Sequence, residues 1–498
     1  MANKNISKSR FIAGLQCEKR LWLEIHRREL AGETDEQTLF IFDRGHIIGE
    51  MVQTLFPEGV LISEDHLHMA QSIEATQRAV QKGESVIFEA GAKFGRFVAR
   101  ADILKRVEDG GEEWDIMEVK SGSDEEKEVY LNDLAIQTLI FEGAGYKIRK
   151  ACLVTINTDY VRDGPIDVKK LFIITDQTKT VRNIYKNFPA IMEKFLTVVD
   201  SEQEPKVAIS NQRCYKPYTC SFADYCWKGV PEDSVFTLAY DRKKLAPNLY
   251  SKGIVKIADI PEDLPLSIKQ IRQIQAAKTG KPYWNLKGVE SFLNSLEYPL
   301  YFLDFETYCP LIPPYDGIRP YRNIPFQFSM HHLEKPGGEL KQFEFLSDGK
   351  EDPRPIFMEA LLKDIGKNGS IVVYSGYEAQ RLNDMAGWFP QYAPAIRAIN
   401  KRMRDLLVPF RNRDVVYPGF LGSASIKAVL PVLVPGMGYD SLEIGEGGAA
   451  SLAYEKLLDP KVPKAEKDKI RKDLLVYCGQ DTLAMVKLVE VLKEKVSI

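Results

Sequence analysis

Two acidic patterns, each associated with apolar runs, constrain the fold of this chain most strongly. In the N-terminal part, one apolar run ends at Asp102, and the next contains Glu118 with Lys120 two positions later. In the C-terminal part, an apolar run leads into Asp304 and Glu306. Side chains two residues apart point to the same face of a strand. We therefore expect two sheets, each presenting carboxylates on one face.

The arrangement of apolar runs and breaks predicts an α/β protein in three parts. A chain of 498 residues is long enough for two domains. We predict a mixed sheet flanked by helices at 1–230, a helical connector rich in Gly and Pro at 231–295, and a second α/β domain at 296–498.

Periodicity indicates the main elements of the two predicted domains. The expected helical stretches are 7–23, 47–55, 130–144 and 470–492. The expected strands are 85–88, 97–104, 114–119, 151–156, 300–303 and 370–374.

Composition places the chain among ordinary globular proteins. It is 44% hydrophobic and 28% charged, which argues against long disordered tracts. It has no run of 18 apolar residues and no apolar leader, so we expect no membrane span and a cytoplasmic protein. The net charge of −3 does not indicate nucleic-acid binding, although a local basic groove would suffice for it.

The first acidic pattern is suited to a divalent metal ion. Asp102 and Glu118 on adjacent strands can hold Mg²⁺ or Mn²⁺, which prefer oxygen ligands. Lys120 can orient the attacking water or stabilise charge on a phosphate. Gln137 on the following helix can contact Lys120 or the phosphate. The alternative is a solvated Glu-Lys pair on a surface strand, since this spacing also arises by chance.

With these residues, the N-terminal part resembles the RecB-type branch of the PD-(D/E)XK nuclease superfamily. The resemblance implies a restriction-endonuclease-like sheet and catalytic roles for the four residues of the pattern. The chain departs from the branch at Phe141, where tyrosine is frequent. It also has Gly49 at the position of a metal-binding histidine, which His46 or Glu50 can replace.

Four of the seven cysteines form a pattern of their own. A disulfide framework is not expected in a cytoplasmic chain. Iron–sulfur members of the RecB-type branch place one cysteine before the nuclease core and three after it, so the resemblance implies a [4Fe–4S] cluster, with zinc as the alternative. The spacing departs from that of these relatives, and buried thiols without a ligand remain possible. The four are Cys17, Cys214, Cys220 and Cys226, whereas Cys152, Cys309 and Cys478 are expected to be ordinary buried thiols.

The second acidic pattern is completed near the C-terminus. Tyr477 and Asp481 lie four residues apart on a predicted helix, so they share a face. With Asp304 and Glu306 they can bind two metal ions, and Tyr477 can orient the attacking water. The alternative is an ordinary strand that happens to end in acidic residues.

This second set resembles the tyrosine variant of the DEDD exonucleases, which have an RNase H-like fold. The middle motif departs from that family, because Glu378 stands where aspartate is usual, and Asp405 is the next acidic candidate. The tandem order of the two parts resembles a bacterial family with a C-terminal domain of unknown function.

The sequence suggests a nucleic-acid substrate but not its details. The absence of a GxxxxGK[ST] segment predicts that any unwinding comes from a separate helicase. Aromatic residues 308, 315, 321 and 326 can stack on unpaired bases, although core packing is the simpler expectation. Candidate backbone-binding cations are Lys147, Arg149, Lys150, Arg162, Arg319, Arg322 and Lys427.

Our first hypothesis is a metal-dependent nuclease with two modules. It would act on DNA ends or single strands, with RNA as a further substrate class, in repair or in defence. The second hypothesis is a nucleic-acid-binding or scaffold protein in which one or both sites have lost catalysis. The departures at Gly49 and Glu378 motivate the second hypothesis.

Overall fold

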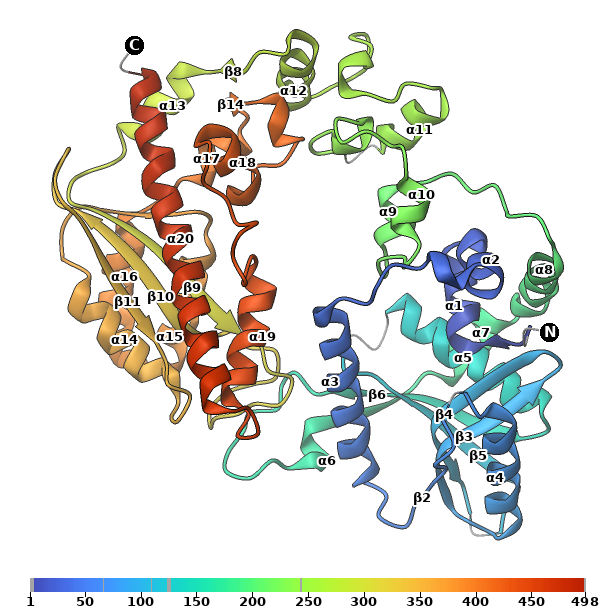
Figure 1. Ribbon diagram of the computed structural model, residues 1–498. Helices are drawn as coiled ribbons and strands as arrows, with labels where there is room; N and C mark the ends of the chain where they lie inside the picture. Colours follow the sequence, from blue (N-terminus) through green and yellow to red (C-terminus); the bar gives the residue numbers. More distant parts are fainter. Residues whose placement is uncertain (1–3, 66, 109, 123–126, 242–243, 497–498) are drawn as a thin grey trace. The chain divides into compact units, whose positions relative to one another are not determined.

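The chain is an α/β protein built on two mixed sheets, as predicted (Figure 1). The computed structural model describes residues 4–65, 67–108, 110–122, 127–241 and 244–496. The chain forms two compact units. Unit 1 comprises Met1–Lys228 and Leu311–Tyr321, and unit 2 comprises Gly229–Pro310 and Arg322–Ile498.

Unit 1 is built around a sheet in which β4 and β5 are central. The strand order of this sheet is β2-β3-β4-β5-β6-β7, and β1 pairs in parallel with the start of β4. Neighbours are antiparallel except for the parallel pairs β2–β3 and β5–β6. The strands are β1 (Ile6–Ser7), β2 (Val60–Leu61), β3 (Val86–Phe94), β4 (Phe97–Arg106), β5 (Glu113–Val119), β6 (Lys147–Ile156) and β7 (Phe172–Asp176).

The helices of unit 1 pack on this sheet through large apolar side chains. Helix α5 is buried over most of its surface because it packs against the sheet, α1 and α7. The helices are α1 (Lys8–Gln16), α2 (Glu18–His26), α3 (Glu36–Gln53), α4 (Met69–Gln81), α5 (Glu128–Gly143), α6 (Val168–Leu171), α7 (Thr178–Tyr185), α8 (Phe188–Asp200), α9 (Asn211–Tyr215) and α10 (Ala223–Trp227).

The predicted helical stretch 7–23 is interrupted at Cys17. This residue has extended backbone angles (φ −163°, ψ 119°), so it ends α1 and begins α2. Its N–H still donates to the carbonyl of Ala13 at 2.9 Å, which satisfies the end of the first helix.

Unit 2 is built around a five-stranded sheet with β9 at its centre. The order is β11-β10-β9-β12-β13. β10 is antiparallel to both β9 and β11, whereas β12 is parallel to β9 and β13. The strands are β9 (Leu300–Tyr308), β10 (Ile324–Leu333), β11 (Leu340–Leu346), β12 (Ser370–Val373) and β13 (Met403–Asp405).

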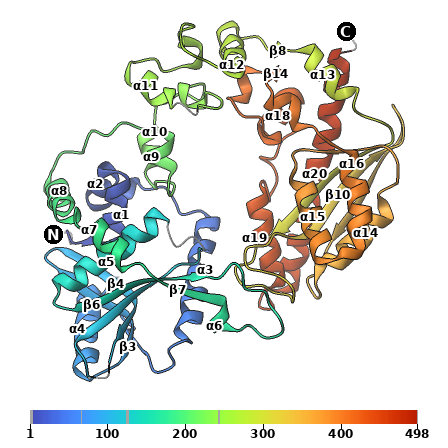
Figure 2. The same ribbon diagram turned by 180° about the vertical axis from the view of Figure 1, so that it is seen from behind.

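Helices cover both faces of this second sheet (Figure 2). Helices α19 (Gly447–Leu458) and α20 (Lys464–Val496) pack on β9 and β10, and α14 (Pro353–Asp364) packs on β10 and β11. Because β9 is covered on both sides, its side chains are nearly all buried. The remaining helices of this half are α15 (Tyr377–Trp388), α16 (Ala393–Arg402), α17 (Leu407–Arg411) and α18 (Ile426–Leu433).

The predicted connector 231–295 packs within unit 2 and does not form a separate part. Arg272 on α12 (Ile268–Thr279) donates to the Asp414 carboxylate at 3.0 Å, and Asn285 donates to it at 2.8 Å. Strand β8 (Tyr283–Trp284) pairs with β14 (Val415–Val416). These polar contacts explain why a segment rich in Gly and Pro is fixed. The other helices here are α11 (Leu245–Ser251) and α13 (Leu286–Leu293).

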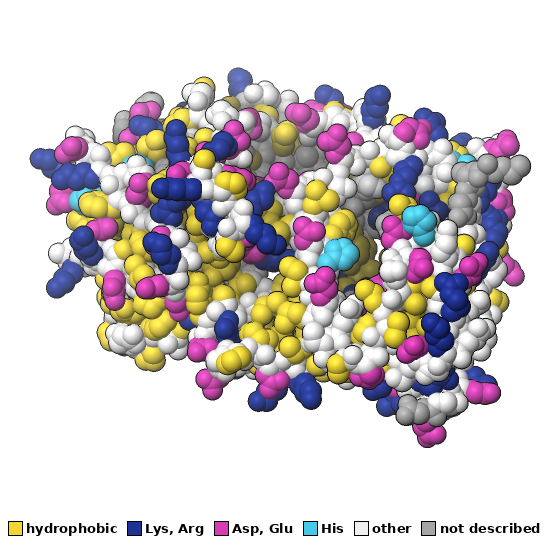
Figure 3. Space-filling view, turned by 60° about the horizontal axis from the view of Figure 1, so that its bottom comes forward, with side chains coloured by type: hydrophobic (Ala, Val, Ile, Leu, Met, Phe, Trp, Pro, Cys, Tyr) yellow, Lys and Arg dark blue, Asp and Glu magenta, His cyan; other side chains and the backbone are white. Residues whose placement is uncertain are grey.

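One face of the molecule carries charges of both signs. On the face shown in Figure 3, basic side chains are interspersed with acidic ones, in keeping with the net charge of −3. None of the helices in the described part of the chain is both long and apolar enough to cross a membrane.

Candidate functional sites

The first acidic site lies where β4, β5 and α5 meet in unit 1. The antiparallel register of β4 and β5 places Asp102 beside Glu118. Asp102 Oδ2 accepts the backbone N–H of Val119 at 2.7 Å, which fixes its direction. The Gln137 amide donates to Glu118 Oε2, whereas we expected it to reach Lys120 or a phosphate. The glutamine therefore holds the glutamate in place.

Two lysines and a further carboxylate complete this cluster. Lys120 Nζ donates to Glu118 Oε1 at 2.7 Å and also to Asp133. Lys8 Nζ lies 2.8 Å from the same Glu118 oxygen and 3.6 Å from Asp133 Oδ2. The sequence analysis missed Lys8 and Asp133. Asp133 could have been found, because it precedes Gln137 by four residues and so shares its helix face.

Glu89 is a third residue that the sequence analysis missed. In the antiparallel register of β3 and β4 it lies opposite Asp102, with a φ of 57° that is uncommon for a residue other than glycine. Its carboxylate pairs with Arg100 at 2.9 Å. Burial raises the pKa of Glu89; Arg100 opposes the rise and Glu118 adds to it. The sequence could have indicated Glu89, because it is a single glutamate inside the apolar run 86–92.

Burial and charge set the ionisation of the first site. Burial, assisted by the negative charge of Glu118, raises the pKa of Asp102 to about 8. Burial would also raise the pKa of Glu118, but Lys120 and Lys8 outweigh it and hold that pKa well below its usual range. Burial likewise raises the pKa of Asp133. The site therefore combines a glutamate that two lysines keep ionised with Asp102, whose raised pKa a bound cation would lower.

Helix α3 carries the position where the resemblance implies a histidine. Gly49 has open space around its Cα, so no side chain fills that position. His46 is exposed and close enough to Glu89 to lower the pKa of that carboxyl. Glu50 is exposed as well. Of the two residues proposed to replace the missing histidine, His46 is the one that acts electrostatically on a carboxyl group of the site.

The four patterned cysteines lie together, although two ends of unit 1 supply them. Residues 211–227, here called the cysteine loop, run from α9 to α10 and carry three of them. The N–H of Cys220 donates to the carbonyl of Cys214 at 2.7 Å. Burial raises the pKa of Cys220, with Cys17 and Cys226 adding to the effect. Cys17 and Cys214 likewise raise the pKa of Cys226.

The four patterned thiols are not linked by disulfides, and all seven cysteines are free. No three of the four patterned sulfurs, all of them in the described part of the chain, lie within 4.8 Å of one another.

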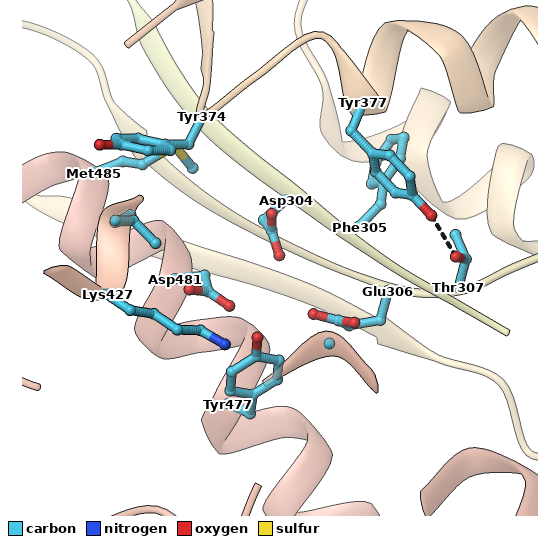
Figure 4. A pocket seen from close by; sticks show the side chains of 12 residues that line it. Asp304, Phe305, Glu306, Thr307, Tyr374, Tyr377, Lys427, Tyr477, Asp481 and Met485 are labelled. Carbon is cyan, nitrogen blue, oxygen red and sulfur yellow. Dashed lines mark hydrogen bonds between the residues drawn. The ribbon is translucent and has the colours of Figure 1, made fainter. Parts of the chain in front are cut away.

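The second acidic site is a cavity of about 270 Å³ in unit 2. In Figure 4 the carboxylates of Asp304, Glu306 and Asp481 face a common space, and the Tyr477 hydroxyl and Lys427 ammonium point into it. Asp304 and Glu306 come from β9, whereas Tyr477 and Asp481 lie one turn apart on α20. The structure thus brings together the two ends of the predicted motif.

Glu378 also belongs to this cluster. It lies in the first turn of α15, is 3% exposed, and its negative charge adds to the rise in the pKa of Asp304. Its Oε2 atom has no hydrogen-bond partner among the described residues. Asp405, the second candidate, pairs with Arg411 at 3.3 Å and reaches Glu378 only electrostatically. Glu378 is therefore the acidic neighbour of Asp304.

Tyr439 and Cys478 are site residues that the sequence analysis missed. The Tyr439 hydroxyl lies 2.5 Å from Asp481 Oδ1 and donates to it. Cys478 Sγ lies 3.7 Å from Asp304 Oδ2, and ligand atoms of Asp304, Glu306 and Cys478 all lie within 4.8 Å. We expected Cys478 to be an ordinary buried thiol. The sequence could have indicated Cys478, because it lies between Tyr477 and Asp481 on one helix.

Lys427 is the cation of the second site. It extends from the start of α18, and its Nζ lies 5.5 Å from the Tyr477 ring centre and 5.6 Å from that of Tyr439. It opposes the rise in the pKa of Glu306 and Asp481. The sequence analysis named Lys427 as a phosphate-binding candidate, and its position is compatible with that role.

Burial dominates the ionisation of the second site. It raises the pKa of Asp304, with Asp481 and Glu306 adding to the rise, and it also raises that of Glu306 well above the usual range. Burial raises the pKa of Glu378 to about 8 and that of Asp481 to about 6. Four carboxyl groups thus share one nearby ammonium. Such a cluster takes up protons or binds additional cations.

Most other predicted nucleic-acid contacts are engaged within the protein. Arg149 pairs with Asp115 at 2.5 Å, and Arg162 donates to backbone carbonyls of Pro313 and Pro314. Lys147, Lys150 and Arg319 form ion pairs with Glu112, Asp176 and Asp159. Tyr308 and Phe326 are buried and pack with Tyr454, so core packing explains these two aromatics.

Comparison with known families gives one match. Residues 301–425 match the family described as Domain of unknown function (DUF2779). This segment contains Asp304, Glu306 and Glu378 but ends before Tyr477 and Asp481. A search of curated proteins found no match.

Proposed function

We propose that the chain is a metal-dependent nuclease with two modules. It would hydrolyse phosphodiester bonds in DNA, at ends or in single strands, in repair or in defence against foreign DNA. The observation that carries the proposal is the second site, where the half-buried Asp304 and three buried carboxyl groups lie near one lysine and two tyrosines. Burying this much acidity is unfavourable unless cations neutralise it.

The donor set of the second site suits Mg²⁺ or Mn²⁺, because nearly all the ligand atoms are carboxylate oxygens. Such ions polarise a phosphate and lower the pKa of a bound water. Asp304, Glu306 and Asp481 would hold them, with Glu378 next to Asp304.

The other residues of the second site have separate roles in this proposal. The Tyr477 hydroxyl points into the cavity and would orient the attacking water. Burial keeps the pKa of Tyr477 above its usual range, so its hydroxyl stays protonated and donates a hydrogen bond. The Lys427 ammonium would contact a substrate phosphate.

The first site supports the same chemistry with different residues. Asp102 and Glu118 would hold a metal ion, and Lys120 would stabilise negative charge on the phosphate. Gln137 restrains Glu118, and Glu89 lies opposite Asp102 as a further oxygen donor. The four cysteines would hold a [4Fe–4S] cluster, with a zinc ion as the alternative.

A second candidate function is nucleic-acid binding without cleavage at one or both sites. The position of Gly49 is empty where the resemblance implies a metal-binding histidine. In addition, both oxygens of Glu118 already accept hydrogen bonds from side chains. A first site that never binds metal would act as a polar anchor only. Any unwinding of duplex substrate would require a separate helicase under either function.

The decisive experiment measures cleavage of labelled single-stranded DNA, duplex DNA and RNA with Mg²⁺ or Mn²⁺. Glu118→Ala should remove one activity and Asp304→Ala another, each by about 10²-fold or more. Asp159→Ala, at an exposed residue with an ion pair elsewhere in unit 1, is the control. A double variant that cuts as fast as the parent would refute the proposed nuclease. Tight binding without cleavage at any metal concentration would establish the second candidate.

A further inference from the structure

Lys8 is placed among the acids of the first site although it lies far from them in the sequence. Its Nζ is 2.8 Å from Glu118 Oε1 and 3.6 Å from Asp133 Oδ2, and its side chain is only 20% exposed. Burial alone would lower the pKa of Lys8, but Asp133 and Glu118 outweigh it and hold that pKa above its ordinary value. Lys8 therefore places an ammonium group against two carboxylates of the first site.

Lys8 and Lys120 share one oxygen of Glu118. Both ammonium groups bond Oε1, while the Gln137 amide occupies Oε2. A carboxylate oxygen has two lone pairs, so these three donors leave little free capacity on Glu118. A metal ion that binds Oε1 must therefore displace one of the two ammonium groups, whereas Oε2 keeps one free lone pair. Lys120 also forms a hydrogen bond with Asp133, whereas Lys8 lies 3.6 Å from that residue. Lys8 is therefore the easier of the two lysines to displace.

A single helix joins Lys8 to the cysteine centre. Lys8 is the first residue of α1, and Cys17 follows the last one. Nine residues of α-helix span about 13 Å, so α1 is a short rigid rod. Gln16, at its end, donates through Nε2 to the backbone carbonyls of Arg213 and Tyr218, both at 2.8 Å. Those two carbonyls belong to the cysteine loop.

The opposite end of α1 is anchored to the sheet. Ile6 and Ser7 pair with Phe97 and Val98 at the start of β4, and the Ser7 hydroxyl caps the helix. Lys8 thus follows directly on a strand that is fixed to the same β4 that carries Asp102.

The cysteine loop also approaches the site directly. Lys127 lies over the ring of Tyr130 at 4.8 Å and over that of Tyr218, in the loop, at 5.8 Å. Lys120 lies 5.4 Å from the centre of the Tyr130 ring. The loop and the site are therefore linked through packed side chains as well as through α1.

We propose that Lys8 is a functional cation of the first site and that α1 makes its position depend on the cysteine loop. Without metal, Lys8 neutralises Glu118. When a metal ion takes Glu118, the displaced ammonium is left beside the site, where it contacts a phosphate of the substrate. The phosphate contact rests on the proposed nuclease function, whereas the competition with metal does not.

Manganese binding tests the competition directly. Titration followed by electron paramagnetic resonance should be done in the Asp304→Asn, Asp481→Asn background, so that the first site dominates binding. Lys8→Ala should bind Mn²⁺ about tenfold more tightly, because a like charge beside the ion is removed. Lys8→Arg should resemble the parent. The control is Lys170→Ala, at a lysine of unit 1 that pairs with Asp167 at 3.3 Å and is not part of the acidic site or the cysteine loop.

The changes in Mn²⁺ affinity and in cleavage rate together distinguish a functional role of Lys8 from a structural one. At saturating Mn²⁺, Lys8→Ala should cleave at the first site at least about tenfold more slowly than the parent, although its metal affinity is higher. A structural defect would weaken both properties. Unchanged or weaker Mn²⁺ binding in Lys8→Ala overturns the inference alone. A parent protein that binds no Mn²⁺ at this site overturns both the inference and the proposed function.

Hydrogen exchange tests the link to the cysteine loop. Gln16→Ala removes two hydrogen bonds to the loop and leaves every thiol in place. Backbone amides of α1 should then exchange hydrogen faster. The affinity for Mn²⁺ should increase, as it does in Lys8→Ala. Cys214→Ser should have a larger effect of the same kind, whereas Cys309→Ser, outside the centre, should have none. Unchanged exchange of α1 in both Gln16→Ala and Cys214→Ser would refute the link.

Discussion

The hydroxyl of Tyr439 donates a hydrogen bond to Oδ1 of Asp481 at 2.5 Å, and it does so from a loop outside the helix that carries Asp481. This contact fixes the last acidic residue of the second site from two sides, because α20 positions its backbone and Tyr439 its carboxylate. The bond also favours the ionised form of Asp481 and so lowers its pKa against the effect of burial.

Tyr439→Phe should therefore shift the pH dependence of the second site. Loss of a hydrogen bond to a charged group costs about 1.5–3 kcal/mol, which corresponds to about one to two pKa units for Asp481. Cleavage should fall more at pH 6 than at pH 8, as measured by a pH–rate profile with Mn²⁺. Tyr374→Phe is the control, since its hydroxyl donates to the carbonyl of Ala424 at 2.7 Å. An unshifted profile in Tyr439→Phe would contradict this assignment.

Tyr477→Phe should separate water positioning from metal binding. We expect cleavage at the second site to fall by about 10²-fold, the usual effect of losing a positioned proton donor or acceptor. Mn²⁺ affinity should stay within about twofold of the parent, because the ligands are the carboxylates. Tyr377→Phe offers a comparison, because that hydroxyl bonds Thr307 at 2.5 Å at the edge of the same cavity. Equal losses in the two variants would argue against a specific role for Tyr477.

The metal-free protein should become less stable as pH rises. Folded-state pKa values of about 8 for Glu378 and about 6 for Asp481 lie above those of the unfolded chain. Between about pH 4 and pH 8 the folded state binds more protons, so the free energy of unfolding falls with increasing pH. Melting temperatures measured in chelator should show this decline, with a smaller slope in Glu378→Gln. Mn²⁺ should restore stability at the upper end of the range.

If Glu378→Gln declines as steeply with pH as the parent, the carboxyl of Glu378 does not titrate in this range. Melting of a Glu262→Gln variant is the matched control, because Glu262 is exposed and pairs with Lys278 at 2.9 Å, away from the second site.

Anaerobically purified protein should be brown and contain iron and sulfide bound by the four cysteines. Cys17→Ser should lose the colour and the iron, because it removes the only ligand supplied by the N-terminal end of unit 1. Cys309→Ser should keep both. Metal analysis and visible absorption measure the outcome. A colourless protein that contains zinc would establish the alternative metal and would weaken the RecB-type assignment.

The sequence predicts best where chemistry and periodicity coincide. The apolar run before Asp304 predicts β9, and the helical spacing of Tyr477 and Asp481 predicts α20. The break in the first helix at Cys17 has no comparable signal, because no Pro or Gly marks it. Its cause is tertiary: the chain turns there toward the cysteine loop.

The candidate sites show the same limit at the level of single residues. Asp102 and Glu118 follow from strand position, whereas Lys8 reaches them only through the pairing of β1 with β4. Tyr439 lies in a loop, where no repeat indicates the direction of a side chain. Residues brought to a site by long-range packing have no local pattern, and for them the sequence alone is insufficient.

The segment Leu311–Tyr321 belongs to unit 1, although β9 precedes it and β10 follows it in the chain. Leu311, Ile312 and Tyr321 pack on the core that includes Ile103 and Met117, next to the first acidic site. During synthesis, this core is therefore complete only after the ribosome has made the first strand of the second sheet. A truncated chain that stops at the end of the N-terminal region would lack part of its own interior.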